Sequence, residues 1–170
     1  MPKQAAVIIA QKDFRDEELH DIRAVLNSRN ITTIVVTKTR NKAVGKFGME
    51  IKPDLAIAEI ETKDFDALVF VGGTGCRQYM SDEVALKLIN EFKNSGKILC
   101  GSCLAPSILA SAGALISKRV TAFPTEEENL KNKGAEYTGM PIETDGNIVT
   151  SKDPTDAEKF AEQIVYLLEG

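Results

Sequence analysis

Residues 97–115, KILCGSCLAPSILASAGAL, combine a short apolar strand, a turn of small residues and a helix in direct succession. Lys97–Cys100 has the length and composition of a buried strand, and Ala105–Ala112 has those of a helix. Pro106 suits the first helical turn, because its missing N–H would have no partner there. A strand that leads directly into a helix is a basic unit of parallel sheets. The stretch therefore predicts an α/β fold, with Cys103 at the joint.

Similar strands and helices alternate along the rest of the chain. The pattern predicts a first helix that Asp13 or Asp16 caps and that runs to about Arg29, and further helices at 82–94, 126–133 and 155–169. It predicts strands at 5–10, 31–37, 67–71, 119–122, 141–144 and 147–151. Residues 40–65 are broken by glycine and proline and indicate a small hairpin or bent strands. A helix that connects two parallel strands forms a right-handed crossover. We therefore expect a mostly parallel, doubly wound sheet with helices on both faces, a three-layer α/β sandwich. The length suits a single domain spanning 1–170.

Composition excludes several classes of protein. Apolar residues make up 43% of the 170 residues and charged residues 27%, with a net charge of −4. There is no basic tract of the kind that follows phosphates, so nucleic acid is not an expected partner. The longest apolar runs are too short to cross a bilayer, which excludes a membrane-spanning segment. Three cysteines, an odd number, do not form a secreted disulfide framework and fit a reducing cytoplasm.

The position of Cys103 is typical of a reactive thiol. Gly101 and Ala105 lie two residues before and after it, and such small neighbours permit the sharp strand-to-helix turn of a nucleophile elbow. The carboxyl ends of the strands are where ligands bind in sheets of this kind. We expect the N–H groups of the following helix to favour the thiolate and lower the pKa of the Cys103 thiol. The alternative is a buried cysteine that acts only as a small apolar residue.

Glu18 is the candidate partner of that thiol. It lies one helical turn before Ile22, at the top of the apolar stripe of the first helix, where a carboxylate requires a partner. This helix starts near the same sheet edge as Cys103. Glu18 is therefore expected to reach the sulfur, either as a hydrogen-bond donor or as a base. Alternatively, it only interacts with the helix dipole.

A glycine-rich turn, Gly72-Gly73-Thr74-Gly75, follows another strand at this edge. Glycines there allow close backbone approach, so the N–H groups of Gly73 and Leu104 are candidates for an oxyanion hole. We include Gly72, Thr74 and Cys76 as possible pocket residues. The alternatives are an ordinary tight turn and, for Cys76, a small residue at a helix start. The run is too short for a dinucleotide fingerprint.

The chain contains one histidine, His20, two residues after Glu18. Positions i and i+2 do not share a helix face, so His20 is expected at the surface, and an intrachain Cys–His–acid triad is not expected. The cysteines and His20 lack the spacing of a zinc finger. We therefore expect neither a metal nor another cofactor.

Four blocks that cover nearly the whole chain carry a family resemblance. They are AAVIIAQKDFRDEEL (5–19), ALVFVGGTGCRQYMSDEVALKLINEF (67–92), GKILCGSCLAPSILASAGAL (96–115) and GAEYTGMPIETDGNIVTSKDP (134–154) with the closing helix. Together they resemble the ThiJ/PfpI family, also called the Parkinson-protein family, of the class I glutamine amidotransferase-like superfamily. The resemblance implies a flavodoxin-like sandwich, commonly a homodimer. It also implies Cys103 as nucleophile or oxidisable cysteine, Glu18 as its acid, and Gly73 and Leu104 as backbone donors.

The sequence departs from the family pattern at two places. Many hydrolase-like members have a histidine directly after the cysteine, where this chain has Leu104. Others have one in the block that matches VTAFPTEEE, where this chain has Phe123. Both departures remove the usual proton carrier, which argues against peptidase activity and weakens a glyoxalase assignment.

Three functions remain open at this point. The first is a cysteine-dependent lyase or hydrolase that acts on a small carbonyl or amide, of the kinds described for the family as glyoxalases and deglycases. The second is a non-enzymatic redox, stress-response or chaperone protein in which an oxidant modifies Cys103. The third is a dithiol oxidoreductase, since Cys100 and Cys103 have C-x-x-C spacing and Pro141 lies downstream. Against the third, Cys100 is predicted to end a buried strand.

Overall fold

A computed structural model describes residues 2–170. Its main sheet has seven strands in the order β11-β12-β8-β7-β1-β3-β6, and only β11 runs antiparallel to its neighbour. The strands span Gln4–Ile8 (β1), Thr32–Thr37 (β3), Leu55–Ala56 (β6), Ala67–Phe70 (β7), Ile98–Ser102 (β8), Ile142–Asp145 (β11) and Ile148–Ser151 (β12). This topology confirms the predicted mostly parallel, doubly wound sheet.

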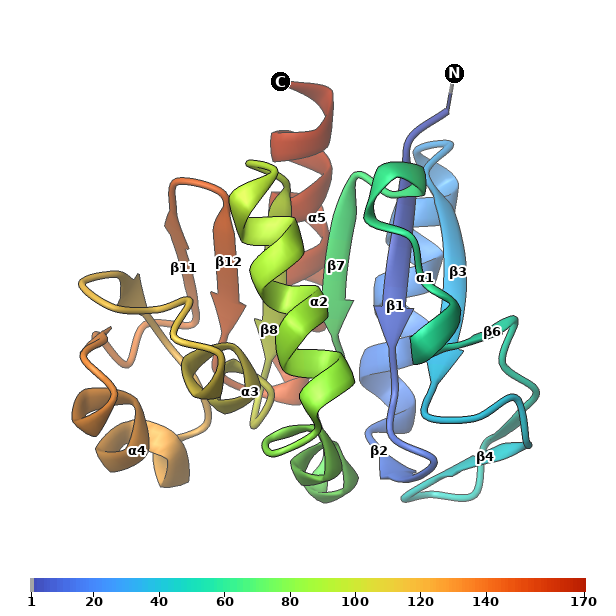
Figure 1. The fold of residues 1–170 in the computed structure, drawn as a ribbon, viewed down its shortest axis with the longest axis horizontal. Coiled ribbons are helices and arrows are strands. Elements are labelled where there is room, and N and C mark those ends of the chain that lie inside the picture. Colours follow the sequence, from blue (N-terminus) through green and yellow to red (C-terminus); the bar gives the residue numbers. More distant parts are fainter. Residues whose placement is uncertain (1) are drawn as a thin grey trace.

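Helices cover both faces of the sheet, as Figure 1 shows. α1 (Asp16–Ser28) and α5 (Ala157–Glu169) lie on one face, and α2 (Glu83–Asn94) and α3 (Pro106–Ser111) lie on the other. α4 (Glu127–Asn132) and a two-stranded sheet of β9 (Arg119–Val120) and β10 (Glu136–Tyr137) extend one side. At the opposite side, β2 (Lys12–Phe14), β4 (Ala43–Gly45) and β5 (Glu50–Ile51) form a third small sheet. The three-layer α/β sandwich is therefore confirmed.

The alternation of side chains in the strands explains the two cores. In β1, Ala6 and Ile8 pack toward α2 and α3, whereas Val7 packs toward α1 and α5. Successive residues of a strand point to opposite faces, so a strand covered on both sides must be apolar throughout. Every residue of β7 and β8 is buried. The apolar stripe of α5 is buried as its helical spacing predicts.

The start of α1 differs from the sequence prediction. Neither Asp13 nor Asp16 caps this helix: Arg15 occupies the N-cap position and provides no side-chain cap bond in the described part of the chain. The Asp16 carboxylate instead accepts the backbone N–H groups of Phe47 (3.0 Å) and Met49 (2.9 Å) in the turn between β4 and β5. This tertiary contact fixes the small sheet against the first turn of α1, beside Glu18.

Candidate functional site

Cys103 lies directly after β8 and has a left-handed backbone conformation, with φ of 59°. Backbone hydrogen bonds hold it on both sides: its N–H donates to the Ser151 carbonyl (3.0 Å), and its own carbonyl accepts the Phe123 N–H (2.8 Å). A non-glycine residue with positive φ is uncommon, and at a strand-to-helix joint it is the strained turn of a nucleophile elbow. These bonds hold the strained turn in place.

A cleft of about 550 Å³ opens above this turn. Cys103 borders it together with Gly73, Thr74 and Leu104, which come from the ends of the two neighbouring central strands. Charged and apolar side chains line the rest of the cleft. They include Arg15, Glu17, Lys46, Phe123, Asp153 and Pro154. The cleft therefore lies at the carboxyl edge of the sheet, where this fold places its ligands.

Glu18 is fully buried beside this turn. One of its oxygens, Oε1, accepts the N–H of Gly72 (3.1 Å) and the hydroxyl of Ser102. Its other oxygen, Oε2, is buried and has no hydrogen-bond partner among residues 2–170, so the expected hydrogen bond between Glu18 and the Cys103 sulfur is not formed there. Burial raises the pKa of Glu18 to about 7, and the bonds from Ser102 and Gly72 oppose that rise. Glu18 can therefore take up or release a proton near neutral pH.

The pKa of the Cys103 thiol is raised, contrary to the expectation from the following helix. Burial is the main cause, because Cys103 is only 6% exposed, and the negative charge of Glu18 adds to it. The Leu104 N–H favours the thiolate, but it is the weaker influence. α3 is a helix of six residues, so the field of its N-terminus is small. The resting site therefore holds a neutral thiol.

The two glycines of the turn after β7 are required by close contacts. A side chain at Gly72 would place its Cβ 2.7 Å from the Cys103 Cβ and 2.7 Å from the Ser102 carbonyl oxygen. Gly73 has φ of +102°, and a Cβ there would lie 2.5 Å from the Asp13 carbonyl oxygen. Glycine alone fits both positions, since such contacts leave no room for a Cβ.

The remaining candidates divide between the cleft and the core. Thr74 is exposed at the cleft, whereas Cys76 is 1% exposed, lies outside the cleft wall and has a pKa raised by burial to about 12. His20 is exposed and contacts Asp21, as expected of a surface residue. Cys100 packs on the α1 and α5 face of the sheet, whereas Cys103 packs on the α2 and α3 face. This separation argues against a Cys100–Cys103 dithiol.

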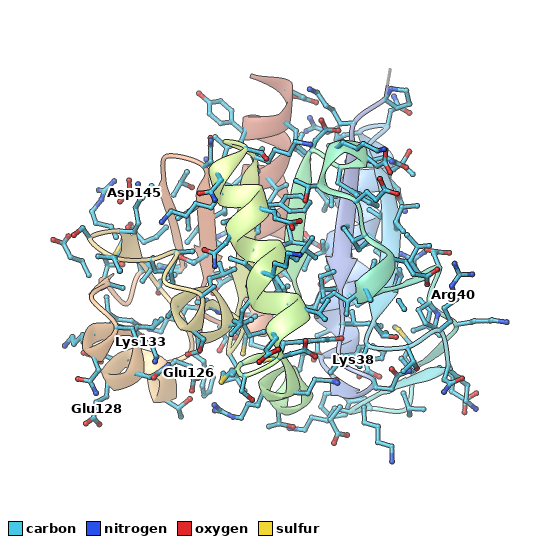
Figure 2. The ribbon with its side chains drawn as sticks, in the orientation of Figure 1. Lys38, Arg40, Glu126, Glu128, Lys133 and Asp145 are labelled. Atoms are coloured by element: carbon cyan, nitrogen blue, oxygen red, sulfur yellow. The ribbon has the colours of Figure 1, made fainter. Side chains whose placement is uncertain are left out.

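Sequence reasoning missed two features of the site. The contact of Ser102 with Glu18 was missed, although serine is an unusual residue at the end of an otherwise apolar strand, which is a usable signal. The second is a buried carboxylate, Glu126, labelled in Figure 2, which pairs with Arg77 (3.0 Å) and accepts the Ser107 hydroxyl (2.9 Å). Glu126 lies directly before α4 and so joins the turn after β7 to α3. Within residues 2–170, no cluster of three or more metal-binding side chains occurs.

Comparison with known proteins identifies the family. The family model described as the DJ-1/PfpI family matches residues 3–167. The chain belongs to the DJ-1/PfpI family. A relative of this family, an uncharacterized protein of Methanocaldococcus jannaschii, is 37% identical over 96% of this chain and 81% of its own. A protein of Thermococcus kodakarensis named a deglycase is 32% identical over 95% of this chain and 98% of its own.

Solved structures agree with the DJ-1/PfpI assignment. The chain is similar to a ThiJ/PfpI domain protein of Brachyspira murdochii, with a TM-score of 0.96 and 29% identity over 99% of this chain and 98% of that one. It is also similar to DJ-1beta of Drosophila melanogaster, with a TM-score of 0.91 and 26% identity over 99% of this chain and 91% of that one. Among the described residues of this chain, 2–170, no helix is long and apolar enough to cross a membrane.

Proposed function

We propose that this protein acts on small reactive carbonyl or amide substrates through Cys103, assisted by Glu18, as a glyoxalase-, deglycase- or hydrolase-like enzyme. One observation carries the proposal: an elbow cysteine borders a cleft of about 550 Å³, and beside it lies a buried carboxyl with a pKa near 7. A perturbed acid next to a nucleophile in a cleft is typical of an active site. The names of curated relatives add support, since those of Thermococcus kodakarensis and Pyrococcus furiosus are deglycases.

The first chemical step follows from these groups. The Cys103 sulfur forms a bond to the carbonyl carbon, and the π electron pair of the carbonyl moves to its oxygen. The thiol proton passes to the Glu18 carboxylate and from there to the new oxyanion, which yields a hemithioacetal without any change of oxidation state. The Gly73 and Leu104 N–H groups are our candidates for holding the oxyanion while it forms.

The test uses methylglyoxal as the probe. We expect the wild-type protein to consume it and to carry a covalent adduct at Cys103, detected by mass spectrometry of the trapped protein. Cys103→Ser should abolish both, because a hydroxyl is a far weaker nucleophile here. Cys76→Ser is the matched control, since Cys76 is buried outside the cleft wall. Consumption that persists in Cys103→Ser would contradict the proposal.

A second function, redox sensing, is favoured by the wall of the cleft. Leu104 and Phe123 border it where the related hydrolases are expected to have a histidine, so Glu18 is the proton carrier beside Cys103. In this alternative the Cys103 sulfur gives two electrons to a peroxide, which releases hydroxide and leaves a sulfenic acid; a second peroxide gives the sulfinic acid and water. Sulfinic acid at Cys103 without turnover of methylglyoxal would favour this function.

A further inference from the structure

We propose that Ser102 is a positioning residue for Glu18: its hydroxyl, with the Gly72 N–H, reserves Oε1 as an acceptor and assigns the transferred proton to Oε2. The inference rests on the proposed chemistry of Cys103 and Glu18, and it concerns which carboxyl oxygen carries the proton. It gives Ser102 a role in the site although its side chain borders no part of the cleft.

The hydrogen bonds around Ser102 fix the direction of donation. The Gly72 N–H lies 3.2 Å from the Ser102 Oγ and 3.1 Å from Glu18 Oε1, so it approaches both oxygens as a donor. The Ser102 hydroxyl accepts from that N–H and donates its own hydrogen to Oε1. Oε1 therefore receives two donors. If Oε1 were protonated, its hydrogen would face the donor hydrogens of Gly72 and Ser102. The proton therefore belongs on Oε2.

Oε2 is the carboxyl oxygen that the protein leaves free to carry that proton. It is buried and has no hydrogen-bond partner within the described chain, so no protein group competes for the proton. Ser102 is 1% exposed, and its bond to Oε1 is shielded from water. A hydrogen bond to a charged group in such surroundings is stronger than one in water. Ser102 therefore both orients the carboxyl group and favours its charged form.

Several charged or titratable groups face Glu18, and they set the background for a pH test. Arg15 and Glu17 act on it from the start of α1, and Glu18 in turn influences the two thiols of Cys76 and Cys103. Both thiols have a raised pKa and stay neutral up to mildly alkaline pH. A change in Glu18 titration between pH 5 and 9 is therefore assigned to its hydrogen bonds when Arg15 and Glu17 are left intact.

The first test measures the titration of Glu18 by NMR of the ¹³C-labelled side-chain carboxyl, assigned by its loss in Glu18→Gln. We expect a wild-type midpoint near pH 7. Ser102→Ala should raise this midpoint by about one pH unit, since a donor to the charged form is lost. Ser151→Ala is the matched control: Ser151 pairs with Ser102 across β12 and β8, is equally buried, and its hydroxyl has no partner within residues 2–170. Equal midpoints in Ser102→Ala and wild type would overturn the proposal.

The second test measures the alkylation rate of Cys103 against pH in the same variants. At pH 7 the Ser102→Ala rate should be about fivefold lower, because less carboxylate is available, and it should recover as pH rises by about one unit. A uniform loss at every pH would indicate a merely structural role and would also overturn the proposal. If Glu18→Gln leaves this profile unchanged while the NMR midpoint still moves in Ser102→Ala, the proposed function fails but the contact of Ser102 stands.

A third measurement needs no Ser102 variant, in case Ser102→Ala does not fold. The infrared carbonyl band of protonated Glu18 is obtained below pH 6 as the difference between wild type and Glu18→Gln. With the proton on Oε2, the carbonyl oxygen is Oε1 and accepts two hydrogen bonds, so its band should lie below that of a carboxyl without hydrogen bonds. A band at the frequency of a carbonyl without hydrogen bonds would overturn the proposal.

Discussion

The side chains of Cys103 and Glu18 lie where water is largely excluded, and both of their charged forms are disfavoured there for that reason. A short helix behind Cys103 does not compensate for this loss of hydration. Glu18 is different, because two hydrogen bonds hold its pKa near neutral pH. At the scale of single residues, the site therefore combines a neutral thiol with a nearby buried carboxyl whose pKa is near 7.

Gly72 provides a prediction at this scale. Its missing side chain makes room for Cys103 and for the Ser102 carbonyl, each 2.7 Å from an added Cβ. We expect Gly72→Ala to lower the free energy of unfolding by about 2 kcal/mol, because backbone and side chain must both shift, and to slow alkylation of Cys103. Urea denaturation and mass spectrometry measure the two effects. Gly48→Ala is the control, since its Cβ would meet no atom within 4 Å, although its positive φ carries some strain. Wild-type stability in Gly72→Ala would show that the turn can relax without cost.

At the scale of elements, local pattern predicted most of the main sheet and failed where tertiary contacts decide. The apolar runs of β1, β7 and β8 have no other stable position than the centre of a covered sheet. Short pieces such as β2 and β10, which were not predicted, carry no periodicity and depend on neighbours far along the chain. Asp16 resembled a helix cap, but it binds the turn between β4 and β5 instead.

The same limit explains which parts of the site were predictable. Cys103 and Gly73 belong to local turns whose geometry follows from their small neighbours. The contact of Ser102 with Glu18 joins residues 84 positions apart, so local pattern marks Ser102 as an unusual strand end but does not identify its partner. The raised pKa of the Cys103 thiol likewise depends on burial by several elements. Sequence therefore located the candidate nucleophile but not its electrostatic surroundings.

Asp82 provides a prediction for α2. Its carboxylate accepts the N–H groups of Val84 (2.9 Å) and Ala85 (3.2 Å) at the start of the helix. We expect Asp82→Ala to lower the free energy of unfolding by about 1–2 kcal/mol, measured by urea denaturation. Asp156 occupies the N-cap of α5 but makes no side-chain cap bond within residues 2–170, so Asp156→Ala should have a smaller effect. Equal losses in the two variants would contradict the capping role of Asp82.

At the scale of the whole molecule, burial of Glu18 should make stability depend on pH. Its pKa is about 7 when folded, against an ordinary value of 4.5, so the folded state binds more protons between these two pH values. Stability from this group is thus fully present below pH 4.5 and falls as pH rises toward 7. We expect wild type to lose roughly 3 kcal/mol more than Glu18→Gln between pH 4.5 and 8, measured by urea denaturation. Parallel pH curves for the two proteins would contradict a buried, perturbed Glu18.

The most direct test of the central claim is the alkylation rate of each cysteine against pH, followed by mass spectrometry in the native protein and in Glu18→Gln. We expect Cys103, which borders the cleft, to react far faster than Cys76 and Cys100, which lie outside its wall. Its rate should rise through an inflection near pH 7 that is absent in Glu18→Gln. A Cys103 as inert as Cys100, or an identical profile in Glu18→Gln, would contradict the account.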